Sequence, residues 1–204
     1  MKLFYSPGAC SLAPHIVARE AGLPLELVRV DLKTHTTESK NDFFKINPRG
    51  YVPVLEIDGE MHTEVVALVQ YLAELAPASN LLPAQGIARF RVSQWLGFIS
   101  SELHKAMSPW LFVDHAHDST KQAVRAKIAG RFALLETHLS DRVYLAEDQF
   151  TVADAYAFTI LSWSDFVKID LKPYPNLQAY QARIAARPKV REALAAEGLL
   201  SKAA

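Results

Sequence analysis

The stretch Tyr5-Ser6-Pro7-Gly8-Ala9-Cys10-Ser11 leads from a short apolar strand into a helix, and it contains the only cysteine of this 204-residue chain. Residues 1–5 have the composition of a strand, and the Pro-Gly pair that follows is a turn signal. Apolar residues then recur at helical spacing. Cys10 is therefore expected at a helix start, where unpaired N–H groups and the helix dipole favour a thiolate. The alternative is that Cys10 is a small buried hydrophobic residue.

The overall composition is that of a globular protein, with 50% hydrophobic residues and equal numbers of basic and acidic residues, 22 of each. Neither a basic run nor an excess of positive charge is present, which argues against nucleic acid or an anionic membrane as a partner. No apolar stretch approaches the ~20 residues that span a bilayer. A lone cysteine cannot form an intrachain disulfide, so the composition predicts a protein of the reducing cytoplasm.

The first part of the chain alternates strand and helix patterns. The valine-rich segment 26–31 predicts a second strand parallel to the first, and the polar segment 33–41 predicts a loop. Segments 52–57 and 60–63 flank an Asp-Gly pair, which is a hairpin signal. A helical stripe follows Glu64 and ends at Pro77. The resulting order β-α-β-loop-β-β-α predicts a thioredoxin-like N-terminal domain over residues 1–77.

Strand patterns are absent from the rest of the chain. Two prolines within residues 76–84 break the periodicity, and the linker is therefore placed at residues 78–85. Residues 86–204 are predicted to form an all-helical domain. Within it we predict helices at about 87–106 and 124–139, with short ones at 183–188 and 190–196. The fold class is therefore α/β followed by all-α.

Two residues of the helical part, Asp154 and His104, are candidates for a structural and a catalytic role, respectively. Asp154 follows Thr151 by three residues, as in a capping box, which makes this pair structural rather than catalytic. His104 and Lys105 lie at the end of the first long predicted helix, where the dipole favours positive charge. A histidine there is either an ordinary residue, exposed at the surface or satisfied by its hydrogen bonds, or an acid–base group working near neutral pH. The pair His115-x-His117 lacks nearby partners, so no metal site is predicted.

Three features of the first domain point to one peptide-thiol site. A cis Pro53 would leave the backbone N–H and C=O of Val52 open to an extended peptide. Glu64 precedes a helix whose first N–H groups can hold a carboxylate, while its own carboxylate can hold an ammonium group. Cys10 stands before another helix. Each feature alone has an ordinary structural explanation, but together they favour a shared site.

The sequence resembles the bacterial, cysteine-containing beta class of glutathione S-transferases. The resemblance rests on M-K-L-F-Y-S-P-G-A-C-S-L, N-P-R-G-Y-V-P-V-L, T-E with V-Q-Y-L-A, S-S-E-L-H-K, F-T-V-A-D-A-Y, R-P-K-V and A-E-G-L, which occur in the family's order over essentially the whole chain. It implies a thioredoxin-like domain, an all-helical domain, a homodimer, and glutathione as co-substrate with no metal.

The resemblance also implies roles for individual residues. It implies that Cys10 faces the glutathione sulfur, that Val52 pairs with the tripeptide backbone, and that Glu64 holds its γ-glutamyl end. His104 is implied to lie beside the thiol, as a second catalytic residue. The full set of implied glutathione-binding residues is Tyr5, Cys10, Ser11, His35, Val52, Pro53, Glu64, Val65, Gly97, Ser101, His104 and Lys105. The implied hydrophobic electrophile pocket consists of Trp110, Phe112, Trp163 and Phe166.

Two residues depart from the family pattern. Val65 stands where many relatives have serine or glycine, so a hydroxyl contact is lost although the backbone N–H remains. Gly97 stands where some relatives have an asparagine that holds glutathione across the dimer. A glycine inside a helix costs about 1 kcal/mol relative to alanine, and it indicates a close helix approach, room for a ligand, or simple tolerance.

Three functions are consistent with these observations. The first is detoxification by conjugating glutathione to small hydrophobic electrophiles, and the second is glutathione-dependent thiol–disulfide exchange through Cys10 by a monothiol route. The third is a non-enzymatic ligandin or stress-associated partner protein on the same fold, which Val65 and Gly97 make credible. The sequence does not identify the electrophile, because loops shape such pockets.

Overall fold

The computed structural model describes residues 1–200, which form two compact units. The first unit combines residues 1–82 with the chain from residue 186 onward, and the second comprises residues 83–185. The break after residue 82 falls inside the predicted linker 78–85. The expected helical domain 86–204 differs from the second unit, however, because the last helix belongs to the first unit. Residues 201–204 of that expected domain lie outside the described residues.

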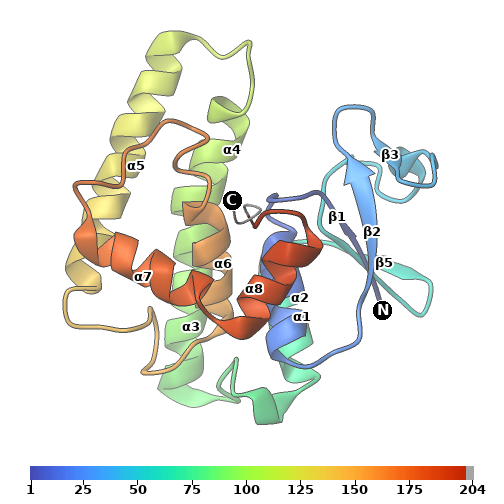
Figure 1. Cartoon of the computed structure of the whole chain (residues 1–204), viewed down its shortest axis with the longest axis horizontal. Coiled ribbons are helices and arrows are strands. Elements are labelled where there is room, and N and C mark those ends of the chain that lie inside the picture. The colour runs from blue at the N-terminus through green and yellow to red at the C-terminus, as the bar shows by residue number, and fades with distance from the viewer. Residues whose placement is uncertain (201–204) are drawn as a thin grey trace. The chain divides into compact units, whose positions relative to one another are not determined.

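A mixed five-stranded sheet forms the framework of the first unit (Figure 1). Its strands are β1 (Lys2–Tyr5), β2 (Glu26–Asp31), β3 (Thr36–Thr37), β4 (Val54–Ile57) and β5 (Glu60–His62), in the spatial order β3-β2-β1-β4-β5. Strand β1 is parallel to β2 and antiparallel to β4. This is the predicted thioredoxin-like arrangement. The segment expected to be only a loop contributes the short edge strand β3.

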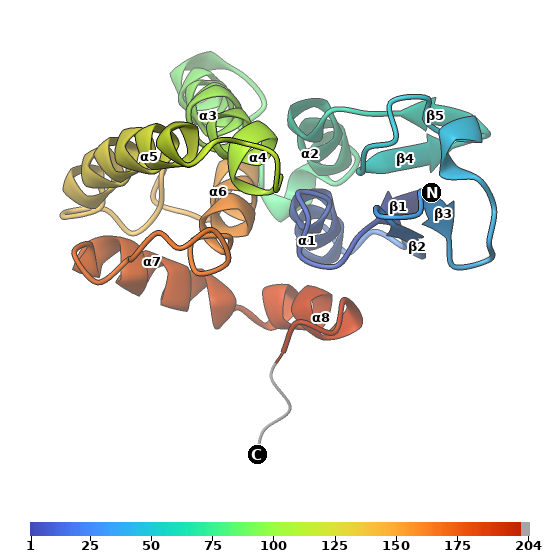
Figure 2. The same ribbon diagram turned by 90° about the horizontal axis from the view of Figure 1, so that it is seen from above.

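Two helices of the first unit pack side by side on one face of this sheet (Figure 2). They are α1 (Leu12–Glu20) and α2 (Val65–Glu74). The apolar stripe of α2 is buried at Leu68, Val69 and Leu72, as its spacing predicted. The C-terminal helix α8 (Pro188–Ala196) also packs against α1. The first unit is thus completed by residues that lie more than 160 positions further along the chain than α1.

The two predicted turn features around β4 are present. The Val52–Pro53 peptide bond is cis and immediately precedes β4. Asp58 and Gly59 both have positive φ, 51° and 86°, and they join β4 to β5 as a tight hairpin. Positive φ at both central positions is what a type I′ turn requires, and Asp-Gly satisfies it readily.

The second unit consists of helices. They are α3 (Gly86–Phe98), a π-helical segment (Ile99–His104), α4 (Lys105–Leu111), α5 (Asp118–His138), α6 (Val152–Leu161) and α7 (Pro175–Ala185). Helix α6 contacts α3 and α7, and all ten of its residues are buried. The predicted short helix 183–188 is wrong, because α7 begins at Pro175 and ends before the helix that opens with Pro188.

The first helical segment of this unit departs from its prediction in a way that matters for His104. Instead of ending near residue 106, it passes through the π-helical segment and continues to Leu111, with Pro109 inside the last part. His104 therefore lies within a helical run rather than at its C-terminus. The dipole argument for positive charge at His104 does not apply.

The capping box at α6 is confirmed and is larger than the sequence indicated. The Asp154 carboxylate accepts hydrogen bonds from the Thr151 N–H at 2.8 Å and the Thr151 hydroxyl at 2.9 Å. It also accepts from the Leu145 N–H and the Tyr180 hydroxyl, both at 2.9 Å. Burial raises the pKa of Asp154, although these hydrogen bonds oppose the rise. Asp154 ties a loop and helix α7 to the start of α6.

None of the helices within residues 1–200 is long and apolar enough to cross a membrane.

Candidate functional site

The Cys10 thiol lies beside the segment that contains the cis proline. Its Sγ donates a hydrogen bond to the Val52 carbonyl oxygen at 3.3 Å, and the residue is partly exposed. The sequence predicted that these two residues share a site, and the first unit brings them together although 42 positions separate them. This hydrogen bond uses the S–H proton, so it is lost when the thiol ionises.

The position of Cys10 relative to α1 differs slightly from the expectation. Helix α1 begins at Leu12 with Ser11 as its N-cap, so Cys10 precedes the cap. The Ser11 side chain is fully buried and both donates to and accepts from the Ser6 backbone at 3.2 Å. The Ser11 hydroxyl therefore holds the loop that carries Cys10, and it is not free to contact a ligand.

Glu64 stands at the start of α2, as predicted, with an unusual backbone and an exposed side chain. Its φ of 71° is positive, which is uncommon for a residue with a side chain and occurs often at functional sites. Its carboxylate is 67% exposed and accepts a hydrogen bond from Arg49 Nη1 at 2.7 Å. Arg49 was not predicted as a site residue, because N-P-R-G indicated only a turn.

Two backbone N–H groups in this region have no hydrogen-bond partner within residues 1–200. They belong to Val52 and Val65. Both valine side chains are buried, so each residue presents backbone rather than side chain. Val65 therefore retains the donor that the resemblance assigns to this position, while its side chain packs inside the unit.

Tyr5 and His35, which were also predicted to bind glutathione, are held mainly by burial and packing. Tyr5 ends β1 and is buried, and burial, with a smaller effect from Glu197, raises the pKa of its hydroxyl. His35 is partly buried and its ring packs against Phe44 at a tilt of 34°, with ring centroids 4.4 Å apart. Its buried Nδ1 atom has no partner among the described residues. Packing against Phe44 therefore holds the imidazole with this ring nitrogen turned away from solvent.

A second buried network supports the loop that carries Cys10. The Glu197 carboxylate, just after α8, pairs with His15 Nδ1 of α1 at 2.9 Å and accepts the Gly8 N–H at 2.9 Å. Both side chains of the ion pair are completely buried. Sequence reasoning missed this role. A-E-G-L was a family motif without an assigned function, and the partners lie almost 190 residues apart.

In the second unit, His104 is buried in an aromatic environment. Its Nδ1 atom is 2.6 Å from the Tyr156 hydroxyl, and its ring packs edge-on to Trp163. Burial, with a smaller contribution from the positive charge of Lys105, lowers the pKa of His104 to about 4. At neutral pH His104 is therefore in its neutral form, held by its hydrogen bond with the Tyr156 hydroxyl. A catalytic role for His104 beside the thiol stays a prediction.

The lowered pKa of His104 makes the stability of the protein depend on pH. The unfolded histidine takes up a proton near pH 6.5, whereas the folded one resists until about pH 4. Stability is therefore expected to fall by about 2 kcal/mol between pH 7 and pH 5 on account of this residue. Urea unfolding of the wild type and His104→Asn at both pH values measures the effect. Equal pH dependence in the two proteins would contradict the assignment.

Three of the four residues predicted for the electrophile pocket form an aromatic cluster. Phe112 packs edge-on to Trp163 at 5.0 Å and stacks on Phe166 at 5.4 Å between ring centroids. Phe166 is 75% exposed, so the cluster has an open apolar side. Trp110 is also exposed, but it makes no ring contact with the cluster within residues 1–200.

The remaining predicted residues of the second unit lie on one helical run. The Ser101 hydroxyl is exposed and donates to the Gly97 carbonyl oxygen at 2.9 Å. A Cβ atom on Gly97 would meet no described atom within 4 Å, apart from the helix's own backbone. No other helix within residues 1–200 therefore approaches Gly97 closely. Lys105 is exposed next to the buried His104.

Metal ligation has no candidate in the described part of the chain. No group of three or more His, Cys, Asp or Glu side chains within residues 1–200 is arranged to hold a metal ion.

Comparisons with known proteins agree with these features. Residues 8–75 match the family model of the glutathione S-transferase N-terminal domain, and residues 98–188 match that of the C-terminal domain. Glutathione S-transferase GstA of Escherichia coli O157:H7 is 44% identical over 98% of this chain and 100% of its own length. The chain belongs to the glutathione S-transferase family.

Solved structures place it near the bacterial members of this family. A ternary complex of BphK, a bacterial glutathione S-transferase, is 51% identical with a TM-score of 0.94, covering 98% of this chain and 100% of that one. The beta-class enzyme of Sphingomonas chungbukensis is 45% identical with a TM-score of 0.94 and the same coverage. A sphingomonad glutathione S-transferase solved with glutathione is 46% identical with a TM-score of 0.93, again with the same coverage. The recognition of a beta-class member from the sequence is confirmed.

Proposed function

We propose that this protein is a glutathione transferase that binds the tripeptide in its N-terminal unit and transfers its thiolate to small hydrophobic electrophiles. The observation that carries the proposal is the hydrogen bond between the Cys10 thiol and the Val52 carbonyl oxygen. This hydrogen bond places the thiol of the partly exposed Cys10 beside the peptide segment before Pro53. Relatives over the full length that are named glutathione S-transferases support an enzyme over a non-enzymatic ligandin.

The groups around Cys10 suit the two ends of the tripeptide. The unpartnered N–H and the carbonyl of Val52 match an extended peptide backbone, which pairs through such groups in β-type recognition. The Val65 N–H at the start of α2 suits the γ-glutamyl carboxylate, and the Glu64 carboxylate suits its ammonium group. The Arg49 guanidinium donates to the Glu64 carboxylate and so restrains its position.

Two reactions follow from a thiol at this position. In conjugation, the glutathione thiol gives up its proton, its sulfur bonds to an electrophilic carbon, and a leaving group departs. In exchange, the Cys10 thiolate attacks oxidised glutathione, forms a mixed disulfide and releases one glutathione thiolate. The partly exposed Cys10 sulfur favours the second reaction as an additional activity.

The residues of the second unit are proposed from the family resemblance. Gly97, Ser101, His104 and Lys105 are proposed for glutathione, and Trp110, Phe112, Trp163 and Phe166 for the electrophile. The open aromatic cluster around Phe112 supports an apolar co-substrate. We also propose a cytoplasmic homodimer. The exposed apolar side chains of Ile87 and Phe90, one turn apart on α3, support a covered surface.

The experiment that tests the site uses Cys10→Ala beside the wild type. After treatment with oxidised glutathione, intact mass measurement is expected to show one glutathione adduct on the wild type and none on the variant. The variant should lose disulfide reduction of hydroxyethyl disulfide at least 100-fold while keeping most aromatic-halide conjugation, because glutathione supplies the nucleophile there. Failure of the wild type to form the adduct would refute the exchange activity, and absence of glutathione binding would refute the proposal as a whole.

A further inference from the structure

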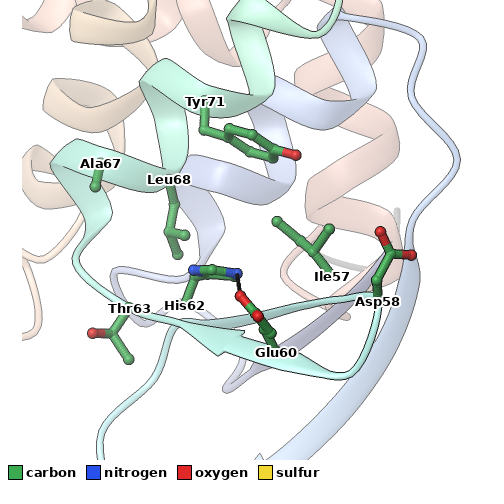
Figure 3. Close-up of a pocket in the computed structure, with 8 residues that line it drawn as sticks. All are labelled: Ile57, Asp58, Glu60, His62, Thr63, Ala67, Leu68 and Tyr71. Carbon is green, nitrogen blue, oxygen red and sulfur yellow. Dashed lines mark ion pairs between the residues drawn. The ribbon is translucent and has the colours of Figure 1, made fainter.

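A pocket of about 550 Å³ lies in the first unit, between the β4–β5 hairpin and helix α2 (Figure 3). None of its lining residues is among the residues assigned to glutathione or to the electrophile. The lining consists of Ile57, Asp58, Glu60, His62, Thr63, Ala67, Leu68 and Tyr71. Its volume is within the range of small-molecule sites, which is about 300–1,000 Å³.

The pocket is lined by both apolar and polar side chains. Ile57 of β4 and Leu68 of α2 extend toward the same space, and the Tyr71 ring lies across it from the hairpin (Figure 3). Tyr71 is 37% exposed, so its ring is accessible to a ligand. These groups suit the hydrocarbon part of a ligand, and an aromatic ring also attracts a cation to its face.

The charged groups of the pocket have one predominant sign. Asp58 and Glu60 lie on the hairpin, and neither lysine nor arginine is among the lining residues. The His62 Nε2 atom is 3.7 Å from the Glu60 carboxylate, whose side chain is 82% exposed. The carboxylate therefore has most of its surface open and is able to bind a cation.

We propose that this pocket binds a small organic cation, a protonated amine attached to a flat apolar body. The amine lies toward Asp58 and Glu60, and the apolar body lies between Ile57, Leu68 and Tyr71. The site is separate from glutathione chemistry and does not depend on the proposed function. An anion is disfavoured because both hairpin carboxylates repel it.

A series of three probes with the same ring tests the proposal. They are 1-naphthylmethylamine, which is a cation at pH 7, the neutral 1-naphthylmethanol, and the anion 1-naphthoate. Each is titrated into the full-length protein in excess glutathione, and backbone ¹H–¹⁵N spectra report where it binds. The amine is expected to shift the resonances of residues 57–71 and to bind about tenfold more tightly than the alcohol, with no such shift from the naphthoate.

Variants then identify the groups responsible. Asp58→Asn with Glu60→Gln is expected to weaken amine binding about tenfold and to leave alcohol binding unchanged. Asparagine tolerates the positive φ of Asp58, so the hairpin is preserved. The control Glu26→Gln with Glu38→Gln removes the same charge from exposed positions outside the pocket. Equal binding of all three probes, shifts located elsewhere, no shifts at millimolar probe, or equal weakening by the control would each overturn the proposal.

Discussion

Replacing Asp154 with alanine is expected to lower the free energy of unfolding by about 4 kcal/mol. The reason is that the carboxylate is fully buried and accepts from four donors, which belong to Leu145, Thr151 and Tyr180. Alanine leaves those donors buried without a partner, and each lost partner costs far more than an exposed hydrogen bond. Chemical denaturation at pH 7 measures the change.

Asp148→Ala is the matched control for this prediction. Asp148 is exposed and precedes the same helix, so its removal should change the unfolding free energy by less than about 0.5 kcal/mol. A loss below 1 kcal/mol for Asp154→Ala would mean that the network does not hold α6 and α7 together as described.

Replacing Glu197 with alanine is expected to cost about 3 kcal/mol and also to slow formation of the glutathione adduct at Cys10. Removal of this carboxylate deletes the hydrogen bonds that it makes with the buried His15 ring and with the Gly8 N–H. Gly8 lies in the turn that carries Cys10, so the thiol loses part of its positioning. Unfolding curves measure the first effect, and the rate of adduct formation by intact mass measures the second.

Glu192→Ala provides the comparison on the same helix. Glu192 pairs with Lys189 at 2.7 Å, but both side chains are about half exposed. Exposed pairs of this kind contribute between 0 and about 1 kcal/mol. A variant at Glu197 that behaves like Glu192→Ala in both measurements would show that the buried pair neither stabilises the unit nor positions the thiol.

The fold of the first unit could be predicted because its signals are local. The Asp-Gly turn, the apolar stripe of α2 and the valine-rich β2 each specify an element within a few residues. The placement of α8 could not be predicted in this way. Its packing on α1 depends on contacts between distant segments, and the periodicity of an amphipathic helix does not identify its partner.

In the candidate site, too, residues with a local sequence signature could be predicted, whereas pairs formed by distant segments could not. Cys10, Val52 and Glu64 were recognised because each stands at a turn or helix start with a local signature. The pairing of Arg49 with Glu64 and of His15 with Glu197 depends on tertiary contacts without such a signature. The low pKa of His104 could not be predicted for a related reason, because burial sets this pKa and the sequence does not give the burial of a single residue.

The central claim is that Cys10, Val52 and the start of α2 bind one glutathione molecule. A crystal structure of the protein with glutathione tests it most directly. We predict the glutathione sulfur in contact with Cys10 Sγ, hydrogen bonds from the tripeptide to the Val52 backbone, and the γ-glutamyl carboxylate at the Val65 N–H. Glutathione bound elsewhere, or bound with its γ-glutamyl end away from Glu64 and Val65, would contradict the account.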